Sequence, residues 1–379
     1  MNHEIHTNDP VDLAVPGVRG LAPYEPGKPI EALAREYGLS DIIKLASNEN
    51  PRGPSPRAVE AARVALESVH RYPDGAATEL RARLADRHGV SASAITVGNG
   101  SNDVLDMIAR VFLGPGTNAV FSRHAFAVYP IATRAAGAAA NVAPARPADD
   151  PEAPYGHDLE AMAAAVDADT RLVFVANPNN PTGTWIDGDA LQDFLRGLPE
   201  HLVAVVDEAY FECADVPGYP DATRWLDAFP NLVVTRTFSK VHGLAGLRCG
   251  YCLSSPAIAD LLNRVRHPFN VNSAALAAAA AALDDEAFLA ESVANNTRGR
   301  DRLTTGLREL GLDVIPSAAN FVAVDVGRDA AAVYEALLRE GVIVRPVGGY
   351  EMPNHLRISV GVDSENERLL DALGRVLRA

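Results

Sequence analysis

Residues 236–248 read Arg-Thr-Phe-Ser-Lys-Val-His-Gly-Leu-Ala-Gly-Leu-Arg, so Lys240 directly follows Ser239 and Arg248 comes eight positions later. The segment between the lysine and this arginine is rich in glycine. A lysine that forms a Schiff base with a phosphorylated aldehyde requires such neighbours, because a hydroxyl and a guanidinium can hold the phosphate while the amine is bound to the aldehyde carbon. The segment therefore predicts a covalent cofactor site at Lys240.

An apolar strand with an acidic end precedes this segment. Residues 203–206 are Val-Ala-Val-Val, Asp207 follows at the end of the predicted strand, and Tyr210 comes three residues later. Asp207 could cap the next element or pair with an arginine, but a carboxylate at the end of a buried strand is costly without a partner. The protonated ring nitrogen of a pyridine is such a partner. Together, Lys240 and Asp207 indicate an enzyme that uses pyridoxal phosphate (PLP).

The pattern around these segments predicts an α/β fold. Short apolar strands alternate with helical stretches, which is typical of a mostly parallel sheet sandwiched by helices. The strands are expected near residues 94–97, 119–121, 172–175, 203–206 and 232–234, and the helices near 56–68, 76–88 and 103–112.

The chain of 379 residues is long enough for a large domain and a smaller one. We expect an N-terminal arm at residues 1–36, where prolines and glycines are frequent. A large PLP-binding domain is expected at 37–270 and a small C-terminal α/β domain at 271–379. The small domain should contain one long helical region, 273–310, and a mainly antiparallel sheet.

Polar clusters follow three of the expected strands, at the edge where doubly wound sheets bind ligands. Ser101 and Asn102 open a helix after Gly98-Asn99-Gly100, so backbone N–H groups there can hold a phosphate. Asn180 lies in the proline-rich turn 177–183, and its side chain could bind a cofactor or only cap the backbone. Phe126 could stack on a cofactor ring or belong to the core.

Composition excludes several other classes of function. The net charge of −15 argues against binding to nucleic acid or to an anionic membrane surface. The polar N-terminus shows no signal peptide, and no apolar run is long enough to span a membrane. Three cysteines cannot form a disulfide framework, and no metal-ligand spacing occurs. We therefore expect a cytoplasmic enzyme without a bound metal that acts on small molecules.

The chain resembles the fold-type I PLP-dependent aminotransferases and, within them, the histidinol-phosphate aminotransferase family. The resemblance extends from Val15-Pro16-Gly17 to Leu356-Arg357-Ile358-Ser359. Five motifs carry it in this order: Asn48-Glu49-Asn50-Pro51-Arg52-Gly53-Pro54-Ser55, Arg71-Tyr72-Pro73-Asp74-Gly75, Asn179-Asn180-Pro181-Thr182-Gly183, Asp207-Glu208-Ala209-Tyr210 and the Lys240 segment.

The resemblance implies a role for each matching residue. Lys240 would be the Schiff-base lysine, Asp207 would bind the pyridine nitrogen, and Asn180 and Tyr210 would bind the ring oxygen. Phe126 would stack on the ring, and the phosphate would be held by Ser101, Asn102, Ser239 and Arg248. The substrate would be bound by Tyr24, Asn50, Tyr72, Asn180, Arg345 and Arg357, with Tyr72 reaching the neighbouring subunit's site in a homodimer. The implied reaction is transamination between L-histidinol phosphate and 2-oxoglutarate, which gives imidazole acetol phosphate and glutamate in histidine biosynthesis.

Three alternatives remain open at this point. An aminotransferase for aromatic amino acids would share all the cofactor residues, and a threonine-phosphate decarboxylase also takes a phosphorylated amine. A PLP-sensing domain of a transcription regulator would carry a DNA-binding segment before the aminotransferase-like part, whereas only a short arm is expected here. His124 and His242 depart from the family pattern, and either could be a harmless variant or could alter the cofactor's surroundings.

Overall fold

The central sheet of the large unit has seven strands. The computed structural model describes residues 9–23 and 27–378, and places the strands in the order β2-β8-β7-β6-β5-β3-β4. Only β8 runs antiparallel to its neighbours, so the expected mostly parallel sheet is confirmed. The strands are β2 (Ile95–Gly98), β3 (Asn118–Ser122), β4 (Ala139–Ala143), β5 (Thr170–Ala176), β6 (Val203–Asp207), β7 (Leu232–Thr237) and β8 (Gly250–Ser254).

Helices cover both faces of this sheet because successive strand residues point to opposite sides. Val205 of β6 packs on one side with α5, α6 and α9, and Val206 packs on the other side with α7 and α8. At the β2 end of the sheet, α4 and α10 pack on β2 and β8, and α3 packs on α10. These helices are α3 (Pro56–Leu66), α4 (Thr78–His88), α5 (Ser101–Phe112), α6 (Val128–Ala135), α7 (Leu159–Ala164), α8 (Gly188–Gly197), α9 (Pro256–Val265) and α10 (Ser273–Leu283).

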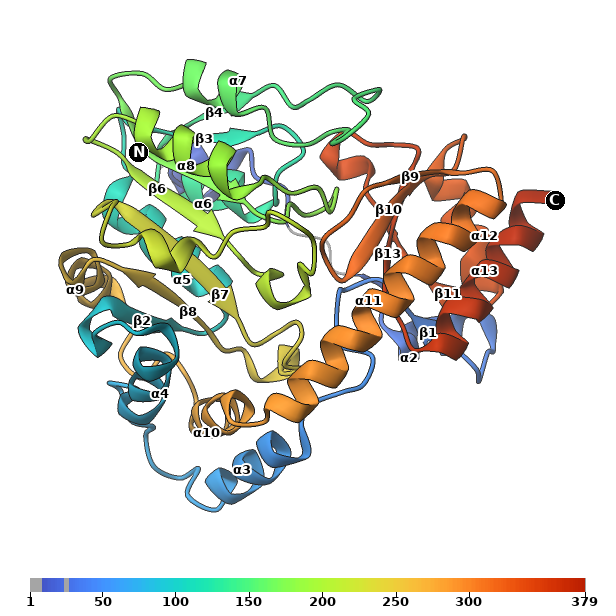
Figure 1. Cartoon of the computed structure of the whole chain (residues 1–379), viewed down its shortest axis with the longest axis horizontal. Coiled ribbons are helices and arrows are strands. Elements are labelled where there is room, and N and C mark those ends of the chain that lie inside the picture. The colour runs from blue at the N-terminus through green and yellow to red at the C-terminus, as the bar shows by residue number, and fades with distance from the viewer. Residues whose placement is uncertain (1–8, 24–26, 379) are drawn as a thin grey trace, which may run out of the picture.

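The smaller unit is built on an antiparallel sheet of four strands, as expected. Its order is β12 (Arg345–Pro346), β13 (His355–Ser359), β10 (Phe321–Asp325) and β9 (Asp313–Ile315). Three helices pack on the sheet around a second core: α11 (Glu286–Glu309), α12 (Ala330–Arg339) and α13 (Asp363–Arg378). Figure 1 shows this unit, in orange and red, beside the large unit, with α11 running between the two.

The segments that adjoin the expected divisions after residues 36 and 270 pack on different units. Strand β1 (Ile43–Lys44) pairs with β11 (Val342–Ile343), and α2 (Ile30–Tyr37) packs through Leu33 on the same small unit. The alanine face of α10, in contrast, packs on the large unit. The helical region expected at 273–310 consists of two helices, α10 and α11. The break occurs at Asp285, which is the N-cap of α11 because its side chain accepts a hydrogen bond from Phe288 N.

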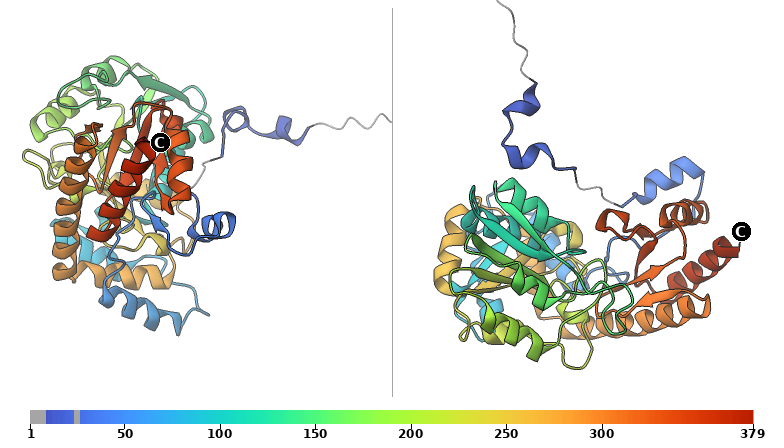
Figure 2. Two further views of the ribbon diagram at one scale, coloured as in Figure 1. Left: turned by 90° about the vertical axis from the view of Figure 1, so that its right-hand side faces the viewer. Right: turned by 90° about the horizontal axis from the view of Figure 1, so that it is seen from above.

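Residues 9–23, the first described part of the N-terminal arm, contribute no buried residue to either core. This part holds a short 3₁₀ helix, η1 (Pro10–Leu13), and one turn of helix, α1 (Pro16–Arg19). Figure 2 shows η1 projecting from the molecule, whereas α1 contacts α6 so closely that a Cβ on Gly17 would lie 2.0 Å from Arg134 O. Across the described residues, no helix is both long and apolar enough to cross a membrane.

Candidate active site

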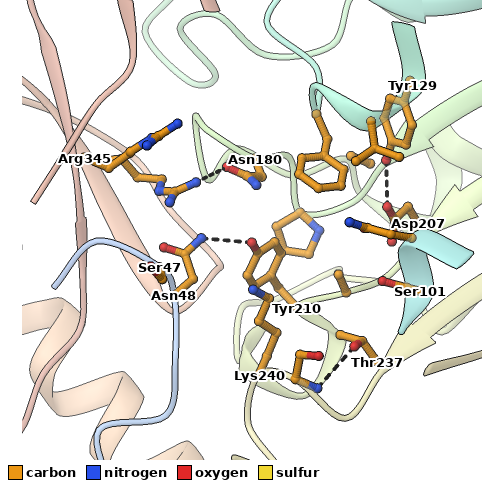
Figure 3. A pocket seen from close by; sticks show the side chains of 18 of the residues that line it. Ser47, Asn48, Ser101, Tyr129, Asn180, Asp207, Tyr210, Thr237, Lys240 and Arg345 are labelled. Carbon is orange, nitrogen blue, oxygen red and sulfur yellow. Dashed lines mark hydrogen bonds between the residues drawn. The ribbon is translucent and has the colours of Figure 1, made fainter. Parts of the chain in front are cut away.

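The site is a cavity of about 410 Å³ where the carboxyl ends of β5, β6 and β7 face the small unit. Figure 3 shows side chains from both units pointing into it. Most of the predicted site residues line this cavity: Ser101, Asn102, Phe126, Asn180, Asp207, Tyr210, Ser239, Lys240, Arg248, Arg345 and Arg357. Segments that are far apart in the sequence thus meet at the edge where the parallel sheet predicts a ligand site.

Asp207 is buried at the end of β6 and holds two hydrogen bonds from side chains. Tyr129 Oη donates to Asp207 Oδ2 at 2.8 Å, and Thr235 Oγ1 donates to Asp207 Oδ1 at 2.9 Å. Burial raises the pKa of Asp207, and the bonds from Tyr129 and Thr235 oppose that rise. The carboxylate is therefore held in one orientation at the cavity wall, where it can pair with a protonated ring nitrogen.

Lys240 lies across the cavity from the Asp207 wall. Its Nζ is 5.4 Å from the centre of the Tyr210 ring. Loss of hydration, and then the positive charge of Arg357, lower the pKa of Lys240 to about 8. A lysine with this pKa is neutral in a substantial fraction of molecules near pH 8, and the neutral amine is the nucleophile that an aldehyde requires.

The N-terminus of α5 and Arg248 form a cradle of the size and charge that suit a phosphate. Gly100 precedes α5 without a side-chain cap, so N–H groups of the first turn remain available. A Cβ on Gly100, whose φ is +85°, would lie 2.4 Å from Arg248 Nη2, so glycine at this position lets the guanidinium approach the backbone closely. With the hydroxyls of Ser101 and Ser239 in the cavity wall, these donors fit the phosphate of PLP.

The remaining polar groups of the cavity are connected across the two units. Arg357 Nη1 donates to Asn180 Oδ1 at 2.6 Å, and its Nη2 donates to Ala46 O at 2.7 Å. The buried Nε of Arg357 makes no hydrogen bond with any of the described residues. Arg345 and Arg357 are directly opposite each other on β12 and β13, and both line the cavity. This wall therefore presents two guanidinium groups to a ligand.

Two of the predicted substrate residues, Asn50 and Tyr72, do not line this cavity. Asn50 instead donates to Val241 O at 2.7 Å and to Ser292 Oγ at 3.0 Å, because its loop packs against the segment after Lys240. Tyr72 is 82% exposed and stacks on Phe269 with a centroid distance of 4.6 Å. Tyr24 lies outside the described residues.

The structure adds cavity residues that the sequence analysis did not select. Tyr129 and Thr237 line the wall, and Thr235 contacts Asp207 from the adjacent strand, where the two residues are register partners. Asn48 also lines the cavity and donates from Nδ2 to Tyr210 Oη at 2.9 Å. Register between β6 and β7 would have indicated Thr235, and Asn48 lies only two positions before Asn50 in the same motif.

The two unusual histidines both contact groups beside the cavity. His124 Nδ1 lies 2.7 Å from Tyr350 O, which connects the loop before Phe126 to the small unit. His242 is 4% exposed, and its Nε2 lies 3.6 Å from Glu212 Oε1. Neither histidine is among the cavity-lining residues.

A buried ion pair supports the strand ends that carry Asp207 and Lys240. Arg236 donates to Glu208 Oε2 from Nε at 3.0 Å and from Nη2 at 2.7 Å, and Nη2 also reaches Asp221. Burial raises the pKa of Glu208 to about 7, against the lowering effect of Arg236. The pair connects Glu208, which directly follows β6, to Arg236 of β7.

Comparison with known proteins gives consistent results. The sequence profile described as "Aminotransferase class I and II" matches residues 40–373. A protein of Methylococcus capsulatus named histidinol-phosphate aminotransferase 2 is 60% identical over 366 residues, covering 96% of this chain and 98% of the relative. A protein of Pseudomonas aeruginosa with the same name is 58% identical, covering 98% of this chain and 99% of the relative.

A solved structure is similar to this one over nearly its whole length. It is histidinol-phosphate aminotransferase from Sinorhizobium meliloti in complex with pyridoxal-5′-phosphate, with a TM-score of 0.87 and 33% sequence identity. The similarity covers 96% of this chain and 97% of that one.

Proposed function

Because the chain belongs to the class I and II aminotransferases and, within them, to the histidinol-phosphate aminotransferase family, we propose that it transfers the amino group of L-histidinol phosphate to 2-oxoglutarate. The products are imidazole acetol phosphate and glutamate, a step of histidine biosynthesis that we place in the cytoplasm. The observation that carries the choice of substrate is the pair Arg345 and Arg357, which are cross-strand partners in the wall of the cavity that also contains Lys240.

PLP is the cofactor, and each part of it has a matching group in this cavity. When bound, PLP supplies an electron sink for the electrons left behind when the substrate loses its Cα proton. Ser101, Asn102, Ser239 and Arg248 hold the phosphate, Phe126 stacks on the ring, and Asn180 and Tyr210 bind the ring oxygen. Asp207 keeps the ring nitrogen protonated, since Tyr129 and Thr235 fix its carboxylate at the cavity wall.

Lys240 has two tasks in this scheme. Its amine would hold the cofactor in the resting enzyme and would be released when the amine of the substrate binds. The free amine would then accept the proton from the substrate's Cα as general base and return it as general acid. A pKa near 8 suits Lys240 both for accepting the proton and for donating it, because near neutral pH the amine binds a proton neither too tightly nor too weakly.

Arg345 and Arg357 recognise the anionic end of each substrate. Guanidinium groups bind phosphate and carboxylate through charge-assisted, bidentate hydrogen bonds, so one wall can serve both histidinol phosphate and glutamate. Asn180, Asn50 and Tyr24 complete the substrate residues of this proposal.

The proposed enzyme is a homodimer in which Tyr72 enters the partner's site. Two observations support this arrangement: Tyr72 lies outside the cavity of its own chain, and it is 82% exposed although its ring is fixed against Phe269. An exposed, ordered aromatic residue is typical of an interface contact.

Product analysis tests the reaction class. The protein is incubated with L-histidinol phosphate, with and without 2-oxoglutarate, and glutamate is measured. It is incubated separately with L-threonine phosphate without an oxo acid, and carbon dioxide is measured; Lys240→Ala serves as the inactive control. Glutamate that forms only with the oxo acid supports the proposal. Carbon dioxide released from L-threonine phosphate without an oxo acid would instead identify a decarboxylase.

A further inference from the structure

Asn48 occupies an unusual position between Tyr210 and the small unit. It is 1% exposed and has a φ of +55°, a conformation that asparagine tolerates better than most residues. Its side chain contacts Tyr210 of the large unit, and its backbone and side chain both contact Ser359 of β13. Asn320 Nδ2 also donates to Asn48 O at 2.9 Å. Asn48 is therefore fixed from several sides.

These contacts determine the direction of each hydrogen bond in turn. Asn48 N can only donate, so Ser359 Oγ accepts at 2.8 Å and its own hydrogen is free for Asn48 Oδ1 at 3.0 Å. With Oδ1 used in this way, the amide group directs Nδ2 toward Tyr210 Oη at 2.9 Å, as Figure 3 shows. An amide nitrogen cannot accept, so the Tyr210 hydroxyl must direct its hydrogen elsewhere.

The hydrogen of the Tyr210 hydroxyl can then point into the cavity. Tyr210 lines the cavity, and the only hydrogen bond that its hydroxyl makes among the described residues is the one from Asn48. Burial also raises the pKa of Tyr210, so the hydroxyl keeps its hydrogen under ordinary conditions.

We propose that Asn48 and Ser359 are positioning residues that orient the Tyr210 hydroxyl as a hydrogen-bond donor to the ring oxygen of the cofactor. The inference rests on the proposed function, since it takes the PLP-binding role of Tyr210 from there. β13 carries Arg357 two residues before Ser359. Through Ser359, the same strand therefore also determines the direction of the hydrogen bond that Tyr210, in the large unit, makes to the cofactor.

Absorbance titration of the protein with bound PLP tests this without relying on turnover. A donor to the ring oxygen stabilises its negatively charged form, so losing the donor should raise the pH midpoint at which the visible band changes. We expect Tyr210→Phe, which removes the donor, to raise the midpoint by about one pH unit, the size of one hydrogen bond, and Asn48→Gly to raise it by part of that amount. Glycine is chosen because it keeps the positive φ without strain.

A second variant and two controls separate orientation from folding. Ser359→Ala should shift the midpoint in the same direction by less, because Asn48 can still contact Tyr210 in some orientations. Ser359→Thr, which keeps the hydroxyl, and Asn295→Ala, which removes a buried amide bonded to Gly361 O, should leave it unchanged. All variants are also made in a Tyr210→Phe background.

We expect Asn48→Gly and Ser359→Ala to shift the pH midpoint in the protein that retains Tyr210. Neither substitution should shift it in the protein that carries Tyr210→Phe. Equal shifts in both backgrounds, or no shift for either Asn48→Gly or Ser359→Ala, would overturn the proposal while leaving the proposed function intact. An unmodified protein that shows no visible band with PLP would overturn both.

Discussion

Tyr129 and Asp207 are 78 positions apart in the sequence, and their side chains share a buried hydrogen bond of 2.8 Å. The Tyr129 ring stacks on Phe174 of β5 with a centroid distance of 4.8 Å and an angle of 6°, so the hydroxyl is held rigidly. The bond thus fixes the acidic group that we propose to pair with the cofactor's ring nitrogen, and it comes from a residue outside the five recognised motifs.

Tyr129→Phe should reduce kcat about tenfold, because a hydrogen bond to a charged group is lost while the ring packing is kept. Tyr251→Phe is the matched control, since it removes another buried hydroxyl, 3.0 Å from His88 Nε2 and outside the cavity. Steady-state kinetics and thermal melting of both variants check the prediction. Equal losses of kcat in the two would mean that the bond to Asp207 has no special role.

Uptake of PLP by the cofactor-free protein should depend on pH through Lys240. The neutral amine attacks the aldehyde, and its pKa is lowered to about 8, so the rate of attachment should rise up to about pH 8 and then level off. Borohydride reduction and peptide mapping should find the label on Lys240, not on Lys28 or Lys44, the other two lysines of the sequence. A rate that keeps rising to about pH 10, as for an ordinary lysine, would contradict the lowered pKa.

Arg345→Ala should raise KM for L-histidinol phosphate about 10- to 100-fold, because it removes charge-assisted hydrogen bonds to the phosphate. The rise for glutamate should be smaller, since a carboxylate carries less charge. Arg339→Ala, an exposed arginine on α12 of the same unit, is the control and should change neither value. Equal increases for the two substrates would reduce Arg345 to a structural role.

Mixed dimers test whether Tyr72 completes the partner's site. Lys240→Ala and Tyr72→Ala should each be poorly active alone. When the two are unfolded together and refolded, mixed dimers contain one site with both native residues, and about a quarter of wild-type activity should return. If mixing restores nothing although mixed dimers form, Tyr72 acts within its own chain or not at all.

The sequence predicted the parts of the site that follow from local patterns. Asp207 could be found because a carboxylate ends an apolar strand, and the phosphate cradle because glycines precede a helix. Thr235 and Tyr129 could not, since their contact with Asp207 depends on strand register and on how α6 packs on the sheet. The pairing of β1 with β11 could not be predicted for a similar reason, because the two strands are almost 300 residues apart and no local pattern encodes their contact.

The most direct test of the central claim is the half-reaction without an oxo acid. The protein carrying PLP is mixed with L-histidinol phosphate or L-phenylalanine, and conversion of the cofactor to its pyridoxamine form is followed by absorbance. The account predicts fast conversion at low concentrations of histidinol phosphate and slow conversion with phenylalanine, because only the phosphate ester engages both Arg345 and Arg357. Faster conversion with phenylalanine, or no conversion with histidinol phosphate, would contradict it.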